Sequence, residues 1–321
     1  MTFYDTHPSN LTAIRDIACD NTAGAAEILS RAAEVYAELM AEQRNRTCLS
    51  AEHAMRRLIQ ASVVLLAAQP GMAPLARLAS VAVDDAAKSS RADEAIERAL
   101  SAARAFAENA VRAGEAAAAH AVELIPDHAK ALTHSRSSTV LLVLRLALEA
   151  GRHPAVIATE SRPMMEGRAL AAELSQMGAT VTLIADADAA SGVEQADVVL
   201  VGADTVTASH VVNKIGTRLI ALAARELGTP VYAVCDTSKF ICSIDALAGL
   251  RRPHDNTELW PDAPDGVEVL NTYFEATPIS FFTSIVTEHG ATRPEEAAGL
   301  AKRFALSDLL LEAICRSRCD R

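Results

Sequence analysis

The sequence predicts an α/β protein: an all-helical N-terminal domain, residues 1–125, followed by a Rossmann-like parallel-sheet domain, residues 126–321. Two observations predict this fold class. Residues 10–120 form alanine-rich segments in which apolar residues recur with the spacing of an α-helix. From residue 128 onward, short apolar segments alternate with helical ones, which is the pattern of βαβ units in a parallel sheet.

The first half of the chain contains helices and no convincing strand. In residues 24–40, apolar side chains such as Ile28, Leu29 and Tyr36 recur at helical spacing. Residues 91–125 read as one long alanine-rich helix. Nothing in this half points to chemistry, so we expect it to serve as a helical scaffold.

The second half alternates strands with helices. Each predicted strand is short and continuously apolar, which is typical of a parallel sheet covered by helices on both faces. The predicted strands are residues 130–135, 154–161, 179–186, 197–204 and 230–236. The predicted helices are residues 137–151, 165–178, 189–196 and 213–227.

The composition bears on which partners the protein can bind and on the cellular compartment in which we expect it. The net charge of −11 argues against a general nucleic-acid surface, which needs a basic patch. No run of about 18 uncharged apolar residues is present, so we expect no membrane span. Six scattered cysteines and no N-terminal signal pattern favour a cytoplasmic protein with reduced thiols. We expect no metal and no cofactor, because zinc-ligand spacing, a G-x-G-x-x-G motif and a P-loop are all missing from the sequence.

Polar residues follow the predicted strands at the points where the strands end. In open α/β sheets, ligands bind beyond the carboxyl ends of the strands. His134 and Ser135 lie at the end of the first predicted strand, Glu160 at the end of the second and Asp204 at the end of the fourth. Asp204 ends a strongly apolar segment, so burial can raise its pKa and suit it to giving and taking a proton.

Cations lie in the same loops. Arg136, Arg162 and Lys214 are placed at or near predicted helix starts, and Lys239 follows the last strand. A helix N-terminus with a cation beside it favours an anion, so these residues predict a phosphate-binding site.

Four segments carry a resemblance to a known family. They are "THSRSSTVL", "ESRPMMEGRALAAEL", "VLVGADTVTASHVVNKIGTRLIALAARELGTPVYAVCDTSKF" and "NTYFEATPISFFTSIVTEHG". Together, over about residues 125–290, they resemble the superfamily of the initiation factor 2B alpha, beta and delta subunits. That superfamily also contains ribose-1,5-bisphosphate isomerase and methylthioribose-1-phosphate isomerase.

The resemblance implies roles for particular residues. In the isomerases of this superfamily, a cysteine in the loop after the first strand and the aspartate of "GAD" form the catalytic pair. Asp204 matches the aspartate, whereas Ser135 stands at the cysteine position. Asn213 and Lys214 match the ligand-binding "NK", and Arg162 matches a position that helps to hold the substrate phosphate.

Three functions stay open from the sequence. The favoured interpretation is a regulatory protein that binds a phosphorylated sugar or nucleotide, because a serine hydroxyl exchanges protons far less readily than a thiol. The first alternative is an aldose–ketose isomerase of a phosphorylated pentose that uses Asp204. The second alternative is a subunit of a translation-factor exchange complex. The resemblance also implies a homodimer or a higher homo-oligomer.

Overall fold

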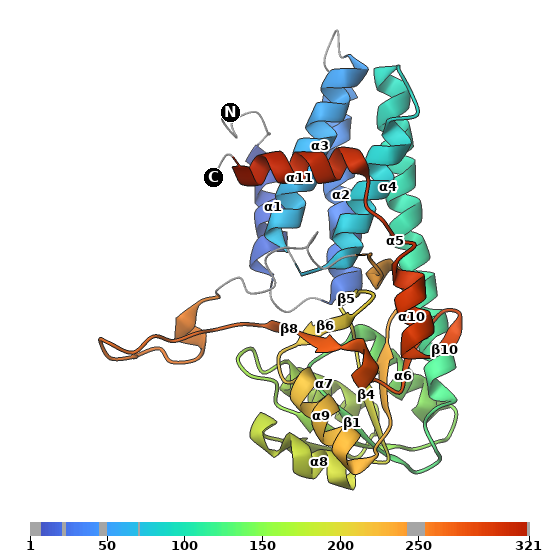
Figure 1. The fold of residues 1–321 in the computed structure, drawn as a ribbon, viewed down its shortest axis with the longest axis vertical. Helices are drawn as coiled ribbons and strands as arrows, with labels where there is room; N and C mark the ends of the chain where they lie inside the picture. The colour runs from blue at the N-terminus through green and yellow to red at the C-terminus, as the bar shows by residue number, and fades with distance from the viewer. Residues whose placement is uncertain (1–7, 21–23, 45–49, 70, 243–253, 320–321) are drawn as a thin grey trace. The chain divides into compact units, whose positions relative to one another are not determined.

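The predicted fold class is confirmed by a computed structural model of the chain (Figure 1). A helical N-terminal part is followed by a mostly parallel sheet with helices on its faces. No helix among the described residues is both long enough and apolar enough to cross a membrane. The structure describes residues 8–20, 24–44, 50–69, 71–242 and 254–319.

The chain divides into two compact units, each with its own core. The first unit comprises residues 1–111, 241–248 and 304–321, and the second comprises residues 112–240 and 249–303. The C-terminal helix therefore groups with the N-terminal helices. The division of the chain into domains at residue 125 stays a prediction.

The first unit is a bundle of helices that pack through small side chains. Ala32, Ala79 and Ala82 are completely buried, which allows the helix backbones to approach closely. Tyr36 is buried among them, and its hydroxyl lies 2.8 Å from the Ser62 hydroxyl. As predicted, no strand lies in the described part of the chain before Lys130. The helices of this unit are α1 (Pro8–Cys19), α2 (Ala25–Arg44), α3 (Ala51–Ala68), α4 (Ala73–Ala86), the first part of α5 (Ala92–Val122), and α11 (Asp308–Cys319).

The second unit is built on a seven-stranded sheet with the order β10-β9-β7-β4-β1-β2-β3. Strand β1 lies inside the sheet and pairs in parallel with both β2 and β4. All four residues of β4 are buried, as expected for a strand covered on both faces. The strands are β1 (Lys130–Thr133), β2 (Ala155–Thr159), β3 (Val181–Ile184), β4 (Val198–Val201), β7 (Val231–Val234), β9 (Ser284–Thr287) and β10 (Gly290–Thr292).

Helices connect the parallel strands, as the alternating pattern predicts. Gly167, in the first turn of the second connecting helix, has no room for a side chain: a Cβ there would lie 1.8 Å from the carbonyl oxygen of Thr159. The helix therefore packs directly on the end of β2. The helices of this unit are α6 (Ser138–Glu149), α7 (Glu166–Gln176), α8 (Ala189–Gln195), α9 (Thr217–Leu227) and α10 (Pro294–Ala301), with short 3-10 turns η1 (Asp186–Asp188), η2 (Thr237–Lys239), η4 (Asn256–Glu258) and η5 (Ile279–Phe281).

One predicted element is wrong at its start. Residues 213–227 were expected to be one helix, but Asn213 and Lys214 end strand β6 (His210–Lys214), and helix α9 begins only at Thr217. Strand β6 pairs antiparallel with β5 (Thr205–Val206) and with β8 (Phe274–Pro278) in a second, three-stranded sheet. The β-branched pair Val211 and Val212 is completely buried there, which favours a strand. Lys214 therefore lies at a strand end and not at a helix start.

Candidate functional site

The order of the strands places a topological switch point between β1 and β4. Going along the chain, strands are added on one side of β1 as far as β3, and then on its other side from β4 onward. The point where the direction reverses is where open α/β sheets bind ligands, outside the carboxyl ends of the strands. The loop of Ser135 follows β1, and the loop of Asp204 follows β4. Two of the predicted site residues therefore lie at the two sides of this switch point.

The loop after β1 is held in an unusual backbone conformation. Ser135 has a φ of 64°, in the left-handed region that non-glycine residues seldom adopt. Its backbone N–H donates to the hydroxyl oxygen of Ser161, 2.7 Å away. The Ser161 hydroxyl lies 3.2 Å from the hydroxyl of Thr159. This network ties the first loop to the second and compensates for the strained backbone.

His134 is buried beneath these loops, and both of its ring nitrogens have partners. Its Nε2 lies 2.7 Å from the carbonyl oxygen of Ile215, and its Nδ1 lies 2.6 Å from the Thr159 hydroxyl. Because a carbonyl can only accept, Nε2 carries the hydrogen and the neutral ring accepts at Nδ1. Burial lowers the pKa of His134, which favours this neutral form. His134 therefore connects the β1 loop to the loop after β6.

Gly216 makes the turn between β6 and α9. Its φ of 106° is accessible to glycine, and a Cβ here would lie 2.9 Å from Cε1 of His134. The Gly216 N–H donates to Oε1 of Glu275, 2.7 Å away. The turn is therefore fixed by the His134 ring on one side and by Glu275 on the other. This fixes the direction of Asn213 and Lys214, the last two residues of β6.

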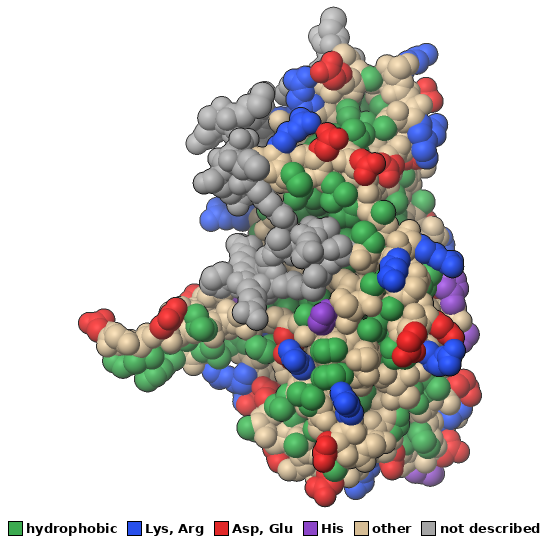
Figure 2. All heavy atoms as spheres, in the orientation of Figure 1, with side chains coloured by type: hydrophobic (Ala, Val, Ile, Leu, Met, Phe, Trp, Pro, Cys, Tyr) green, Lys and Arg blue, Asp and Glu red, His purple; other side chains and the backbone are tan. Residues whose placement is uncertain are grey.

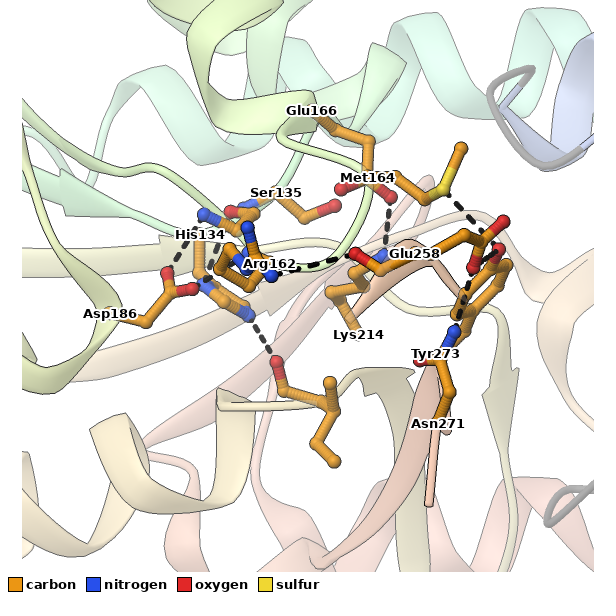
Figure 3. A network of polar contacts seen from close by, with 12 residues as sticks. His134, Ser135, Arg162, Met164, Glu166, Asp186, Lys214, Glu258, Asn271 and Tyr273 are labelled. Atoms are coloured by element: carbon orange, nitrogen blue, oxygen red, sulfur yellow. Dashed lines mark hydrogen bonds and ion pairs between the residues drawn. The ribbon is translucent and has the colours of Figure 1, made fainter. Parts of the chain in front are cut away.

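Lys214 and Glu166 form a buried ion pair that is visible in Figure 3. Nζ of Lys214 lies 2.5 Å from Oε1 of Glu166, and the two side chains are 4% and 11% exposed. The ammonium group also lies 4.7 Å from the ring centre of Tyr273, at cation–π distance. The second carboxylate oxygen of Glu166 is buried and has no hydrogen-bond partner among the described residues. It is an acceptor that a hydroxyl or N–H group can satisfy.

Asp204 is partly buried and interacts electrostatically with Lys239 and Lys214. Its backbone N–H donates to Val212 of strand β6, 2.9 Å away. Desolvation raises the pKa of the Asp204 carboxyl, while the charges of Lys239 and Lys214 oppose that rise. Both lysines are buried, at 7% and 3% exposed. An aspartate whose pKa is raised by burial and that interacts electrostatically with two buried cations is a candidate functional group.

Arg162 lies in a loop whose position Asp186 determines. The Asp186 carboxylate accepts the N–H groups of Ser161 and Arg162, at 2.8 and 2.7 Å. The guanidinium of Arg162 donates to the carbonyl oxygen of Leu259, 3.2 Å away, and is seen beside the buried pair in Figure 3. Asp186, which follows strand β3, therefore holds the loop of Arg162 in place.

Three other predicted site residues have partners within the protein. Nε of Arg136 pairs with Glu173 of α7 at 2.7 Å, and Glu160 pairs with Arg168 at 2.8 Å. The Asn213 amide donates to the hydroxyl of Thr217, 3.0 Å away. The structure thus groups Asp204, Lys214 and Lys239 electrostatically, and it places Arg136 and Glu160 in separate ion pairs.

Some residues of the site were not predicted. Glu166, Tyr273 and Glu258 all contribute to the polar network of Figure 3. The Tyr273 hydroxyl donates to the Glu258 carboxylate, and its ring stacks on His254 with 3.5 Å between centres. Glu166 lies in "MMEGR" and Tyr273 in "NTYFEATP", two segments that carry the family resemblance. Their position in those segments was the one feature of the sequence that could have identified them as site residues.

The site contains no obvious place for a metal ion. Among the described residues, no group of three or more His, Cys, Asp or Glu side chains could hold one. The polar groups described above suit an oxygen-rich anionic ligand, since buried lysines and an arginine would pair with phosphate oxygens.

The fold and this site define a Rossmann-like α/β protein with polar, cation-bearing loops at its switch point. The chain belongs to the Initiation factor 2 subunit family, which it matches over residues 21–294. This confirms the resemblance seen in the sequence.

Two relatives are sugar-phosphate isomerases by name. Methylthioribose-1-phosphate isomerase of Syntrophotalea carbinolica is 34% identical over 249 residues, which are 72% of this chain and 67% of that protein. Ribose 1,5-bisphosphate isomerase of Archaeoglobus fulgidus is 40% identical over 179 residues, which are 54% of this chain and 56% of that protein. The aligned part is therefore about two thirds or less of each relative's length.

Solved structures show the same fold. The translation initiation factor eIF-2B of Pyrococcus horikoshii superimposes with a TM-score of 0.77 at 30% identity, covering 91% of this chain and 99% of that chain. The 5-methylthioribose 1-phosphate isomerase of the same organism gives a TM-score of 0.71 at 25% identity, covering 92% and 87%. Family members with this fold thus carry both enzyme names and translation-factor names.

Proposed function

We propose that this protein is an aldose–ketose isomerase that acts on a phosphorylated pentose. The observation that carries the proposal is the position of Asp204 in the loop after β4 at the switch point, where burial raises the pKa of its carboxyl and the charges of the buried Lys239 and Lys214 oppose that rise. Relatives named as methylthioribose-1-phosphate and ribose 1,5-bisphosphate isomerases support it. These names favour the isomerase over the regulatory binding protein that the sequence alone favoured.

The proposed chemistry needs no oxidant and no cofactor. Converting an aldose to a ketose moves a hydrogen from C2 to C1, with matching proton shifts on the oxygens. Asp204 gives and takes a proton in this step, a role for which a raised carboxyl pKa is well suited. Lys214, Lys239 and Arg162 bind phosphate oxygens, and Glu166 accepts a sugar hydroxyl at its buried second oxygen.

Other predicted residues have supporting roles in this proposal. Asn213 precedes Lys214 on β6 and steadies the turn into α9 through its hydrogen bond to Thr217. His134 positions the loops, because its two nitrogens are already engaged. Arg136 and Glu160 reach the ligand only after leaving their ion pairs. Ser135 hydrogen-bonds the substrate through its hydroxyl.

Binding without turnover is the second candidate, and Ser135 favours it. A thiol has a pKa near ~8.5 and exchanges protons near neutrality, whereas a serine hydroxyl needs a base beside it. Among the described residues, no such base contacts the Ser135 hydroxyl. A role in a translation-factor complex is supported by names alone, and a pull-down that recovers no initiation factor would count against it.

One experiment separates these candidates. Calorimetry with ribose 1,5-bisphosphate, methylthioribose 1-phosphate and AMP measures binding, and a coupled assay measures turnover. The proposal expects turnover that Asp204→Asn lowers by about 10² to 10⁴, with sugar-phosphate binding retained. The exposed Asp188→Asn is the matched control and should change neither. Binding without turnover in the unmodified protein would replace the isomerase with the second candidate, and absence of both would rule out both.

A further inference from the structure

Lys239, the last residue of turn η2, carries a buried cation. Basic side chains are scattered over the face of the molecule shown in Figure 2, where water solvates them. Lys239 differs from these because it is only 7% exposed. Throughout the described part of the chain, no side-chain hydrogen bond or ion pair involves its ammonium group. A buried charge needs compensation, so this group is available to a ligand that carries oxygen atoms.

The fold brings the loop of Lys239 beside the loop of Asp204. Strands β4 and β7 pair in parallel, and beyond their ends an isolated bridge joins Val206 to Phe240. Asp204 lies between these two contacts on one segment, and Lys239 lies between them on the other. The two loops are therefore held together on both sides of these residues. Burial raises the pKa of Asp204, and the charge of Lys239 opposes that rise more strongly than the charge of Lys214 does.

Two carboxylates hold the turn that carries Lys239. Asp236 accepts the backbone N–H of Ser238 at 2.9 Å. Glu288 accepts the backbone N–H of Thr237 at 3.0 Å and also its hydroxyl group. Both carboxylates are thus engaged by the turn itself, which leaves the ammonium group of Lys239 to the site. The Ser238 hydroxyl is buried and has no partner among the described residues, so it is a second group that a ligand can satisfy.

The proposed isomerisation needs a second group that handles protons, because hydrogen moves at the oxygens as well as at the carbons. A serine at the position of the isomerases' thiol does not supply it without a base beside it. Lys214 and Glu166 are paired with each other, and both ring nitrogens of His134 are engaged. Burial raises the pKa of the Cys235 thiol, which makes it a poorer acid. That leaves the ammonium group of Lys239 as the partner of the aspartate.

We propose that Lys239 is a further catalytic residue, which protonates the ring oxygen of a pentose 1-phosphate and later takes the proton of the C2 hydroxyl. This inference rests on the proposed isomerase activity. A pentose with phosphate on C1 is closed into a ring, so the bond from C1 to the ring oxygen must break before C1 can gain hydrogen. An ammonium group has three N–H donors, so it can hold a phosphate oxygen and the ring oxygen together.

The reaction balances in protons and electrons. Lys239 gives a proton to the ring oxygen, which keeps the electron pair of its broken bond to C1. Asp204 takes the proton from C2, and the C–H electron pair forms a double bond between C1 and C2. The neutral amine of Lys239 then takes the proton of the C2 hydroxyl, whose O–H electron pair forms the carbonyl. The double-bond pair forms the new C1–H bond with the proton that Asp204 returns, so both side chains end as they began.

The rate at saturating sugar phosphate tests this role. Lys239→Arg keeps the positive charge, but arginine does not give up its proton, so kcat should fall by roughly 10²-fold or more. Calorimetry should show that the sugar phosphate is still bound, because the charge is retained. Lys302→Ala, at an exposed position directly after α10, is the control and should change neither quantity.

Rescue with a small amine separates proton transfer from charge. Lys239→Ala should lose turnover by a similar factor, and added ethylammonium should restore it by roughly 10-fold. Tetramethylammonium, which has the same charge and no N–H group, should not restore it. Rescue by both ions, or by neither, would overturn the inference, because Lys239 would then act as a charge or within the fold.

The outcomes also separate this inference from the proposed function. An unchanged kcat in Lys239→Arg would overturn the inference and leave the isomerase in place. An unmodified protein that turns over no sugar phosphate would overturn the proposed function and this inference with it. If Lys239→Ala does not fold, Lys239→Met replaces it, since methionine keeps most of the side-chain length without the charge. That variant should show the same loss of kcat, and an unchanged kcat would contradict the role.

Discussion

His134 and Gly216 lie in contact, and that contact joins the two loops on which the candidate site depends. A Cβ at Gly216 would come within 2.9 Å of both Cε1 and Nε2 of the imidazole. The same nitrogen lies 2.7 Å from the carbonyl oxygen of Ile215, the residue before the glycine. The contact therefore holds the loop after β1 and the turn after β6 in a fixed relative position, although 81 residues separate His134 from Ile215.

Gly216→Ala should lower the free energy of unfolding more than the same substitution in a turn with open space around it. Alanine at a φ of 106° is strained, and its methyl group would displace the His134 ring. We expect the free energy of unfolding to fall by about 2–4 kcal/mol, combining backbone strain with the clash. Gly228→Ala, at a φ of 76° with open space around it, is the control and should cost about 1–2 kcal/mol. Denaturant unfolding measures both, and equal losses would show that the contact with His134 is unimportant.

The protein should lose stability in acid through His134. Its pKa is lowered in the folded state, so the unfolded chain takes up a proton first as the pH falls below about 6.5. Stability from this residue is therefore complete above pH ~6.5 and is lost toward its folded pKa, at about 1.4 kcal/mol per pH unit. His134→Gln should flatten that slope between pH 7 and 5.5 in unfolding titrations, relative to the unmodified protein.

The control for that titration is His120→Gln, on an exposed position of α5. It removes an exposed imidazole outside the site and so controls for the loss of one histidine. A slope that is the same in all three proteins would contradict a neutral, buried His134.

Breaking the Lys214–Glu166 pair should be strongly destabilising. Glu166→Leu leaves a buried ammonium without its counter-ion, which costs about 3–5 kcal/mol. The double variant Lys214→Met/Glu166→Leu should recover part of that loss, because no charge is then left unpaired. Chemical denaturation of the four proteins of the cycle measures the coupling.

The exposed pair of Arg168 and Glu160 is the comparison for this cycle, since their side chains are 57% and 22% exposed. Arg168→Met should cost no more than about 1 kcal/mol. A similar small cost for Glu166→Leu would mean that the Lys214 ammonium finds water or another partner.

Ser135→Cys tests whether the site can support isomerase turnover once the thiol of the isomerases is restored. We expect turnover to rise by on the order of 10²-fold, and to increase with pH toward the thiol pKa of ~8.5. The control is Ser138→Cys at the exposed first residue of α6, which should leave turnover unchanged. Unchanged turnover in Ser135→Cys, with sugar-phosphate binding intact, would favour the binding protein.

Local patterns in the sequence were enough for the fold class. Continuous apolar strands such as residues 198–201 cannot face water on either side, so a sheet covered on both faces follows from the sequence alone. The rule that ligands bind at the carboxyl ends of such strands then brings Asp204, Lys214 and Lys239 to one edge. In the structure the charges of Lys239, Lys214 and the unpredicted Glu166 all act on the Asp204 carboxyl, and the roles of the predicted site residues stay predictions.

Only the tertiary structure shows which residues of the site pair with one another. Asn213 and Lys214 lie on a strand because β6 pairs with β8, a contact with residues about sixty positions later that no local period encodes. The partner of Lys214 is Glu166, 48 residues earlier, since both are buried where only a paired charge is tolerated. Thus the sequence by itself determined the five parallel strands from β1 to β7 and the edge where polar groups were expected. The pairing of those groups depends on long-range packing, which only the folded chain provides.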